Sequence, residues 1–183
     1  PLPHYDLEHI ETATKGRRFE IIKSQLSRKR GTVLDIGSAW GYYCHCFEDL
    51  GFDCTAVEND RNALYFMRNL RKSCSKTFRI ITRNIFRLRK DELKYDIILA
   101  FSIFHHFLRT KNLYDDFIDF LKKIDAKEMY FLSYLSDTNP RDDMYKTFSP
   151  EEFAKLIISE SKFQNYELLA DSLYQKRVLY KIY

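Results

Sequence analysis

The sequence lacks a long apolar stretch, because no run approaches the roughly 20 residues that a membrane-spanning helix needs. No signal peptide is recognisable either. Composition excludes a disordered chain, since 45% of the 183 residues are hydrophobic and 16% are aromatic. This length and composition support a substantial core, and we expect one domain over residues 1–183.

Cysteine is scarce, and its spacing fits neither a disulfide framework nor a zinc site. Of Cys44, Cys46, Cys54 and Cys74, three fall in predicted helix or strand. A domain of this size does not need disulfides, so we expect free thiols and a cytoplasmic protein. The trio Cys44-His45-Cys46 superficially resembles a metal site. Adjacent helical residues point in different directions, however, and no second pair completes a tetrahedral site, so we expect no metal.

Strands and helices alternate along the chain, which indicates a doubly wound, mainly parallel sheet. The expected strands cover residues 32–36, 53–58, 78–82, 95–101, 128–134, 166–170 and 175–182. The expected helices cover residues 10–28, 40–50, 61–72, 113–124 and 149–159. The fourth strand is apolar throughout and is therefore expected at the centre of the sheet. The last two strands form an antiparallel pair, and the irregular residues 135–147 are either a solvated connection or a substrate loop.

The clearest functional signal is the segment VLDIGSAWG, which ends at Gly41, together with the strand that ends in Glu58. It indicates a buried strand with an acid near its end, Asp35, and then a turn that contains Gly37. The glycines let the backbone pass close to a ligand. Glu58, 21 residues after Gly37, can accept hydrogen bonds from both hydroxyls of a ribose. Such a corner admits a dinucleotide, an adenylate or S-adenosylmethionine.

The turn itself distinguishes between these ligands. An acid, Asp35, precedes the first glycine, and Ala39 stands where a dinucleotide-binding loop has its middle glycine. A carboxylate at this place repels a pyrophosphate but suits a ligand with a cationic amine. S-adenosylmethionine carries an ammonium and a sulfonium and no phosphate, so the turn favours the methyl donor.

Four segments together resemble the class I, Rossmann-like methyltransferases that use S-adenosylmethionine. They are VLDIGSAWGYY from Val33, AVEND from Ala56, RNIF from Arg83 and YDIILAFSIFHH from Tyr95. The resemblance implies an α/β fold with a seven-stranded, mainly parallel sheet in the order 3-2-1-4-5-7-6. It also implies an antiparallel seventh strand, helices on both faces, and an N-terminal helix over residues 10–28 that caps the cofactor.

The same resemblance implies a role for individual residues. The methionine portion of the cofactor would be held by Asp35, Gly37, Ser38 and Gly41. The ribose and adenine would be bound by Glu58, Asn59, Asn84 and Ile85. The floor beneath the methyl group would be formed by Phe101 and Ser102. Asn84 stands where many relatives have an acid, but an amide oxygen can also accept from the adenine amine. Arg17 or its neighbour Arg18, on the capping helix, is a candidate for the cofactor carboxylate or an anionic substrate.

The histidines after the fourth strand are the candidate catalytic base. Ligands of this fold bind at the carboxyl ends of the strands, which brings His105 and His106 next to the reactive methyl group. Imidazole titrates near pH ~6.5 and can take a hydroxyl proton. The sequence has no N-P-P-Y or D-P-P-Y segment, which resembling enzymes use to grip a planar amine, and no evident cysteine nucleophile. Both absences argue against methylation of a nucleobase.

Charge and a second resemblance bear on the acceptor. Residues 15–30 carry seven basic side chains and one acid, and residues 61–94 carry eleven and two. Such basic segments are either solvated or bind an anionic partner, such as RNA, a phosphorylated glycan or a nucleotide-linked sugar. The YDIILAFSIFHH segment and the chain end also resemble the methyltransferase domain of bacterial O-antigen chain-terminating enzymes, which methylate a terminal sugar or its phosphate. The leading expectation is therefore an enzyme that methylates an oxygen of a small-molecule, sugar or phosphorylated glycan acceptor. An RNA methyltransferase and a non-catalytic module that binds the cofactor or a partner are the alternatives.

Overall fold

The structure, a computed structural model, describes residues 15–134, 144–173 and 177–183. Three predictions fall partly outside these ranges: the first part of the N-terminal helix, residues 135–143 of the irregular loop, and the start of the last strand.

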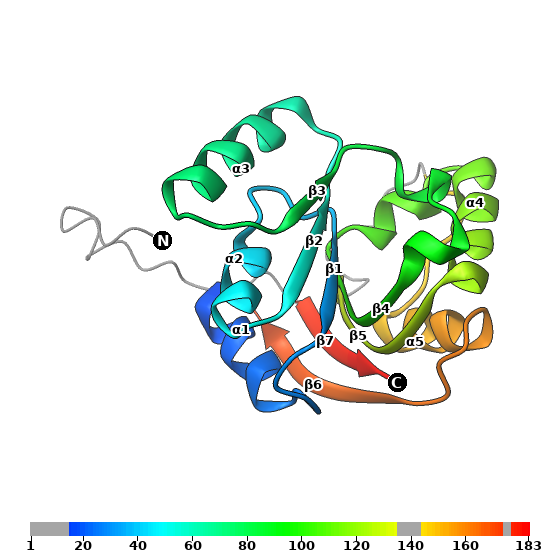
Figure 1. Ribbon diagram of the computed structural model, residues 1–183. Helices are drawn as coiled ribbons and strands as arrows, with labels where there is room; N and C mark the ends of the chain where they lie inside the picture. The colour runs from blue at the N-terminus through cyan, green and yellow to red at the C-terminus, as the bar shows by residue number, and fades with distance from the viewer. Residues whose placement is uncertain (1–14, 135–143, 174–176) are drawn as a thin grey trace.

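Seven strands form one sheet (Figure 1). They are β1 (Thr32–Ile36), β2 (Asp53–Val57), β3 (Arg79–Ile81), β4 (Lys94–Phe101), β5 (Asp125–Tyr134), β6 (Tyr166–Leu173) and β7 (Arg177–Ile182). Their order is β3-β2-β1-β4-β5-β7-β6. Strand β7 runs antiparallel to both of its neighbours, and the other pairs are parallel. The predicted sheet order and the antiparallel seventh strand are confirmed.

Helices lie on both sides of this sheet (Figure 1). They are α1 (Lys15–Ser24), α2 (Tyr42–Asp49), α3 (Arg61–Ser73), α4 (Lys111–Lys123) and α5 (Pro150–Ser159), with short 3-10 helices η2 (Ile85–Arg87), η3 (Lys90–Leu93) and η4 (Phe104–Leu108). Helices α1 to α3 cover one face, and α4 and α5 cover the other. The chain changes faces between β1 and β4, which are neighbours in the sheet. Folds of this kind bind ligands at the carboxyl ends of the strands beside such a point.

Strand β4 lies between two apolar cores. Successive side chains of a strand point to opposite faces, so Ile97 and Leu99 pack towards α1–α3, and Ile98 and Ala100 pack towards α4 and α5. All four side chains are fully buried. Burial on both faces is why this strand is apolar throughout and why its central position could be predicted.

Helix boundaries follow their capping residues. Helix α5 begins with the predicted cap, in which the Ser149 hydroxyl accepts from the Glu152 amide at 3.3 Å and the Glu152 carboxylate accepts from the Ser149 amide at 2.8 Å. Helix α4 begins two residues earlier than predicted because Thr110 caps it. Helix α1 ends at Ser24, so its predicted extension to residue 28 is wrong. After Ser24 the amides of Gln25 and Leu26 donate to the carbonyls of Ile22 and Lys23, which closes the helix in a tight turn.

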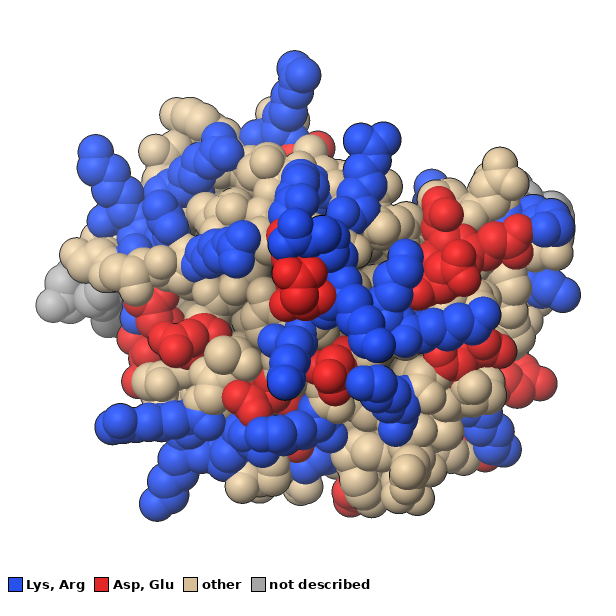
Figure 2. Space-filling view, turned by 45° about the vertical axis from the view of Figure 1, so that its right-hand side comes forward, with Lys and Arg blue, Asp and Glu red and all other residues tan. Residues whose placement is uncertain are grey.

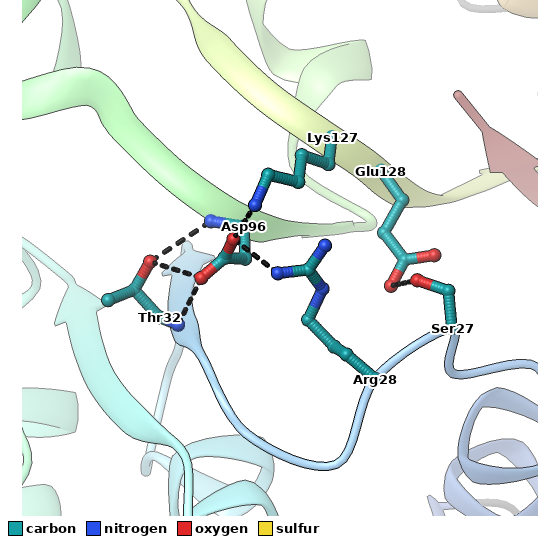
Figure 3. Close-up of polar contacts among 6 residues, drawn as sticks. All are labelled: Ser27, Arg28, Thr32, Asp96, Lys127 and Glu128. Atoms are coloured by element: carbon teal, nitrogen blue, oxygen red, sulfur yellow. Dashed lines mark hydrogen bonds and ion pairs between the residues drawn. The ribbon is translucent and has the colours of Figure 1, made fainter.

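Asp96 joins the amino ends of the central strands to the segment after α1 (Figure 3). Its carboxylate accepts from Arg28 at 2.6 Å, from Lys127 at 2.7 Å and from the Thr32 amide at 2.9 Å. The Lys127 hydrogen bond is the largest influence that lowers the pKa of Asp96, to about 2. A Cβ on Gly31 would lie 2.6 Å from this carboxylate, so the position requires glycine. The cluster fixes the end of the sheet opposite to the ligand-binding end.

Candidate active site

The turn after β1 brings the backbone to the carboxyl end of the sheet. Gly37, Ala39 and Gly41 all adopt the left-handed conformation, with φ of 68°, 50° and 80°. The amides of Gly37 and Ser38 donate to the carbonyl of Val57 at 2.9 and 3.2 Å, which joins the turn to the end of β2. Ala39 adopts a conformation that glycine reaches more easily, at a cost of about 1–2 kcal/mol. The missing middle glycine therefore leaves the left-handed turn in place.

The two glycines of the turn serve different purposes. A Cβ on Gly37 would lie 3.0 Å from the Ile103 side chain, at the edge of a cavity described below. A Cβ on Gly41 would lie 3.1 Å from side-chain atoms of Met67 and Phe78. Gly41 thus lets the start of α2 pack closely on the core, whereas Gly37 shapes the ligand-binding side of the turn.

Glu58, directly after β2, binds the backbone around it. One carboxylate oxygen accepts from the Ala39 amide at 2.9 Å, and the other accepts from the Asn59 and Asp60 amides at 2.8 and 2.9 Å. An ionised carboxylate has about four acceptor positions. One position therefore remains for a ligand hydroxyl, and a second hydroxyl would replace one of the amides. In the structure Glu58 connects the turn after β1 to the end of β2.

A cavity of about 560 Å³ opens beside Glu58. It is bordered by chain segments that follow β1, β2, β3 and β4. Among the predicted site residues, its lining contains Gly37, Glu58, Asn59, Asn84, Ile85, Ser102 and His106. These residues come from four separate motifs of the sequence, and the fold brings them together at one cavity.

Asn84 and Ser102 line this cavity in particular conformations. The side-chain oxygen of Asn84 accepts from the Phe86 amide at 2.9 Å, so it caps η2. Ser102, just after β4, has a φ of 57°, which is uncommon for a residue with a side chain. Its buried hydroxyl has no hydrogen-bond partner among the described residues. Strained backbone with an unpartnered polar group is typical of functional sites.

Asp35 and Phe101 lie in a second group of residues next to the turn. Asp35 is buried, and Cys44 lies with its sulfur 3.9 Å from the carboxylate. A hydrogen bond to Cys54 and burial raise the pKa of the Cys44 thiol well above its usual value, so the thiol stays protonated. The Phe101 ring packs on Tyr43 with centroids 4.6 Å apart. Burial raises the pKa of Tyr43 to about 12, although Arg18 opposes the shift.

Arg18, and not its neighbour Arg17, lies next to Tyr43 and Phe101. Its guanidinium donates to the Tyr43 hydroxyl at 2.9 Å and lies 5.7 Å from the centre of the Phe101 ring. Arg18 is only 6% exposed, and its Nε has no hydrogen-bond partner among the described residues. Arg17 is exposed. The sequence contained the signal for this choice, because Arg18 lies four residues before buried Ile22, on the same helix face.

The histidine pair lies in η4, directly after β4. Both side chains are partly buried, and their ring centroids are 4.0 Å apart. His106 lines the cavity, whereas His105 is outside its lining. The amide of His106 donates to the Ile103 carbonyl at 3.0 Å, which fixes the helical turn that aims the side chain. His106 is therefore the better placed of the two to reach a ligand.

Two arginines of the cavity were missed by sequence reasoning. Arg83 and Arg109 both line it. Arg83 forms an ion pair with Glu92. Arg109 has a buried Nε without a hydrogen-bond partner and makes no ion pair within the described part of the chain. No signal in the sequence points to Arg109, because it follows an irregular helical turn that no periodic pattern predicts.

The described residues contain neither a metal-binding group nor a membrane-spanning helix. Within residues 15–134, 144–173 and 177–183, no group of three or more His, Cys, Asp or Glu side chains could hold a metal ion. The four cysteines are free thiols. No helix in the same ranges has the length and apolar character to cross a bilayer.

Comparison with known proteins identifies the family. The family described as "Methyltransferase domain" matches residues 34–125, half of the chain. No curated protein matches the chain significantly.

Solved structures share the fold at low sequence identity. The chain is similar to the bifunctional kinase-methyltransferase WbdD, with a TM-score of 0.75 and 16% identity over 99% of this chain. That match covers 42% of WbdD, so the chain spans less than half the length of that relative. It is also similar to an S-adenosylmethionine-dependent methyltransferase from Clostridium acetobutylicum, with a TM-score of 0.69 and 13% identity over 97% of this chain and 95% of the other. A third similar structure, a methyltransferase from Aquifex aeolicus, has a TM-score of 0.64 and 12% identity over 90% and 87% of the two chains.

The family match includes the turn after β1, the end of β2 and the segment after β4, which are the segments that border the cavity. The chain therefore belongs to the methyltransferase-domain family, and its sheet has the strand order expected of a class I methyltransferase.

Proposed function

We propose that this methyltransferase acts on an oxygen atom of an anionic small-molecule or glycan acceptor. The observation that carries the proposal is the cavity of about 560 Å³ that both Glu58 and His106 line. Glu58 can accept hydrogen bonds from the ribose hydroxyls, and His106 can take a proton from the acceptor.

The residues present fit S-adenosylmethionine. Glu58 has one free acceptor position for a ribose hydroxyl, and Asn59 and Ile85 line the same cavity for the adenine. Asp35 is a buried carboxylate suited to the ammonium group. Arg18 is a buried guanidinium with an unpartnered Nε, suited to the carboxylate. We assign Arg18 this role in place of the exposed Arg17.

When bound, the cofactor supplies a methyl group on a positively charged sulfur. The residues of the chain align the acceptor and exclude water, and alignment of this kind supplies several kcal/mol of rate acceleration. His106 accepts the proton of the attacking hydroxyl, and His105 packs against it and supports its orientation. Ser102, with its unpartnered hydroxyl, donates a hydrogen bond at the floor of the site.

An anionic acceptor is supported by the charges at the cavity. Arg83 and Arg109 both line it, and Arg109 makes no ion pair with the described residues. A guanidinium binds a phosphate or carboxylate through two parallel hydrogen bonds. The resemblance of the YDIILAFSIFHH segment to O-antigen chain-terminating enzymes supports a sugar or phosphorylated glycan within this class.

RNA methylation is the second candidate, favoured by one observation. The basic residues of segment 61–94 are mostly exposed, on α3 and around η2 and η3. The absence of an amine-gripping N-P-P-Y segment from the sequence argues against nucleobase amines but leaves ribose oxygens as targets.

Calorimetry with two ligands tests the cofactor assignments. S-adenosylhomocysteine has the amino-acid portion, and methylthioadenosine lacks it. We expect Arg18→Met to weaken binding of S-adenosylhomocysteine about tenfold or more, and to leave methylthioadenosine binding unchanged. Arg17→Met is the matched control. Equal effects of the two arginine variants would refute the assignment of Arg18.

Transfer of a labelled methyl group tests the acceptor class. We expect sugar phosphates or phosphorylated oligosaccharides to be labelled at oxygen, and Arg109→Gln to raise KM for these acceptors. Labelling of RNA, with no labelling of any phosphorylated glycan, would replace the leading proposal by the second candidate.

A further inference from the structure

Helix α3 and the turn after β1 expose an unusual group of apolar side chains. Trp40, Tyr65 and Phe66 are 54%, 66% and 49% exposed, and Leu70 is 38% exposed. The Phe66 ring contacts both aromatic neighbours, with centroids 5.6 Å from Trp40 and 5.7 Å from Tyr65. Leu70 follows Phe66 by one helical turn. We call these four residues the α3 patch, and contiguous exposed apolar surface of this kind marks an interaction site.

The exposed surface of α3 also carries basic side chains. Arg61, Arg68 and Lys72 recur at intervals of seven and four residues, which aligns them along one side of the helix. Helix α3 contains no acidic residue. It lies at the periphery of the molecule, at the upper left of Figure 1, and Figure 2 shows many Lys and Arg side chains on one face of the molecule, with acidic groups at its centre and sides. The partner of this helix is therefore expected to be anionic.

A cleft of about 700 Å³ adjoins the basic side of α3. Four cations and two hydroxyl groups line it: Arg68, Arg71, Lys72, Lys76, Ser75 and Thr77. The Arg71 side chain is held in place because it donates to the Phe78 carbonyl at 2.7 Å. No acidic side chain among the described residues lines the cleft, but two acidic groups beside it engage part of the lining: Lys76 forms an ion pair with Asp49, and the Thr77 hydroxyl donates to Glu48 at 2.9 Å. The remaining cations, with the Ser75 hydroxyl, suit a phosphate group.

We propose that the α3 patch docks on an anionic phospholipid surface, with a lipid phosphate in the adjoining cleft. Helices that lie on membranes combine Trp, Phe and Leu with Arg and Lys in this way. The long basic side chains on one flank of α3 reach the same plane as the apolar side chains on the other. Anionic headgroups then attract each cation near the surface.

The shape of the patch favours a bilayer over single-stranded RNA. RNA-binding proteins stack successive bases on accessible aromatic faces along a groove. Here Phe66 already packs against Trp40 and Tyr65, and Leu70 offers no aromatic face. The patch is carried by an outward-facing helix, which suits insertion into the headgroup region.

Docking would hold the cofactor cavity beside the membrane. Trp40 directly follows Ala39, whose amide donates to Glu58 at 2.9 Å. An acceptor attached to a lipid would then be presented near the site. The docking proposal does not depend on the proposed acceptor, because it is tested without methyl transfer.

Trp40 is the one tryptophan of the chain, so its fluorescence reports on the patch directly. We expect its emission to shift to shorter wavelength with phosphatidylcholine vesicles that contain phosphatidylserine, and not with phosphatidylcholine alone. Arg68→Gln and Lys72→Gln should each weaken vesicle partitioning about fivefold. Phe66→Ser should also weaken it, measured by co-sedimentation because this change alters the surroundings of Trp40.

Matched controls come from other surfaces. Lys122 on α4 is exposed, with 58% of its side chain accessible, and Leu168 on β6 is 51% exposed. Lys122→Gln and Leu168→Ser should leave partitioning unchanged, and circular dichroism and melting temperature verify the fold of every variant.

Four results would overturn the proposal. One is the absence of partitioning at any phosphatidylserine content, and another is partitioning that the control variants weaken as much as the α3 variants. The third is quenching of Trp40 by single-stranded poly(U) at concentrations where vesicles have no effect, which would assign the surface to RNA. Sedimentation that shows self-association abolished by Phe66→Ser, without vesicle binding, would assign it to a second copy of the chain.

Discussion

Replacing Glu58 tests whether its carboxylate binds ribose or only braces the backbone. In the structure it accepts from three amides, of Ala39, Asn59 and Asp60, at 2.8–2.9 Å. Hydrogen bonds to charged groups contribute about 1.5–3 kcal/mol when well shielded. These amides are exposed to water when the side chain is truncated, so we expect Glu58→Ala to lower the free energy of unfolding by about 1–3 kcal/mol.

Glu58→Ala should affect binding of the cofactor more strongly than it affects the stability of the fold. Two ribose hydroxyls would bind the carboxylate, but the second must displace an amide because only one of about four acceptor positions is free. A net loss of about 3 kcal/mol corresponds to about 100-fold weaker binding of S-adenosylhomocysteine, measured by calorimetry. The affinity of Glu58→Gln for S-adenosylhomocysteine should lie between those of Glu58→Ala and the parent. The glutamine keeps one acceptor oxygen, but its amide group points a donor at the backbone donors.

Asp60→Ala is the matched control, since it also destabilises the same loop. Asp60 caps α3 by accepting from the Ala63 amide at 2.8 Å, and loss of such a cap costs about 1 kcal/mol. We expect its affinity for S-adenosylhomocysteine to stay near that of the parent. If Glu58→Ala lowers the stability of the fold but not the affinity for S-adenosylhomocysteine, Glu58 only stabilises the backbone around it. If both variants lose affinity equally, the effect comes from the loop.

Three further predictions concern catalysis, packing and pH. His106→Asn should lower kcat by about 10²–10⁴ with unchanged binding of S-adenosylhomocysteine, while His105→Asn should have a smaller effect; equal effects would contradict the assignment of the base. Gly41→Ala should lower the free energy of unfolding in urea by about 2–3 kcal/mol, because the new Cβ makes close contacts and the φ of this position is unfavourable for alanine. Gly51→Ala is the control: Gly51 has a φ of 85°, but no atom lies within 4 Å of the new Cβ, so the loss should be about 1 kcal/mol. The pKa of Asp96 is lowered from 3.8 to about 2, so its stabilising contribution is complete above pH 3.8 and is lost as the pH falls through 2. Between pH 5 and pH 2 the free energy of unfolding of the parent should fall by at most about 2 kcal/mol through this group. Asp96→Asn should not show this part of the pH dependence.

The fold was predictable because its signals are local or periodic. The central strand β4 is apolar on both faces, and the start of α5 is encoded by Ser149, Pro150 and Glu152 within a few residues. The end of α1 was predicted wrongly: the chain leaves the helix after Ser24, and Arg28 binds Asp96, 68 residues away in the sequence, a contact that no local pattern encodes. The short helices η2 to η4 were also missed, since three to five residues carry no period.

The site was predictable to the extent that motif residues lie at the ends of strands. Glu58 and Asn84 follow β2 and β3, and parallel strands bring their carboxyl ends to one edge of the sheet, so their meeting at one cavity follows from the fold. Arg109 enters the cavity from an irregular turn, which sequence periodicity does not describe. Its position had to come from the structure.

The choice between Arg17 and Arg18 depends on the phase of a helix. Adjacent residues on a helix point about 100° apart, so Arg17 and Arg18 face different surroundings. Phe19 and Ile22 are both buried, and Arg18 precedes Ile22 by four residues, which places it on the same side. A buried guanidinium is stable only with partners, and Tyr43 satisfies one of its donors while Nε has none within the described residues. A ligand carboxylate would satisfy that donor, which is the reason why we propose Arg18 for the methionine end of the site.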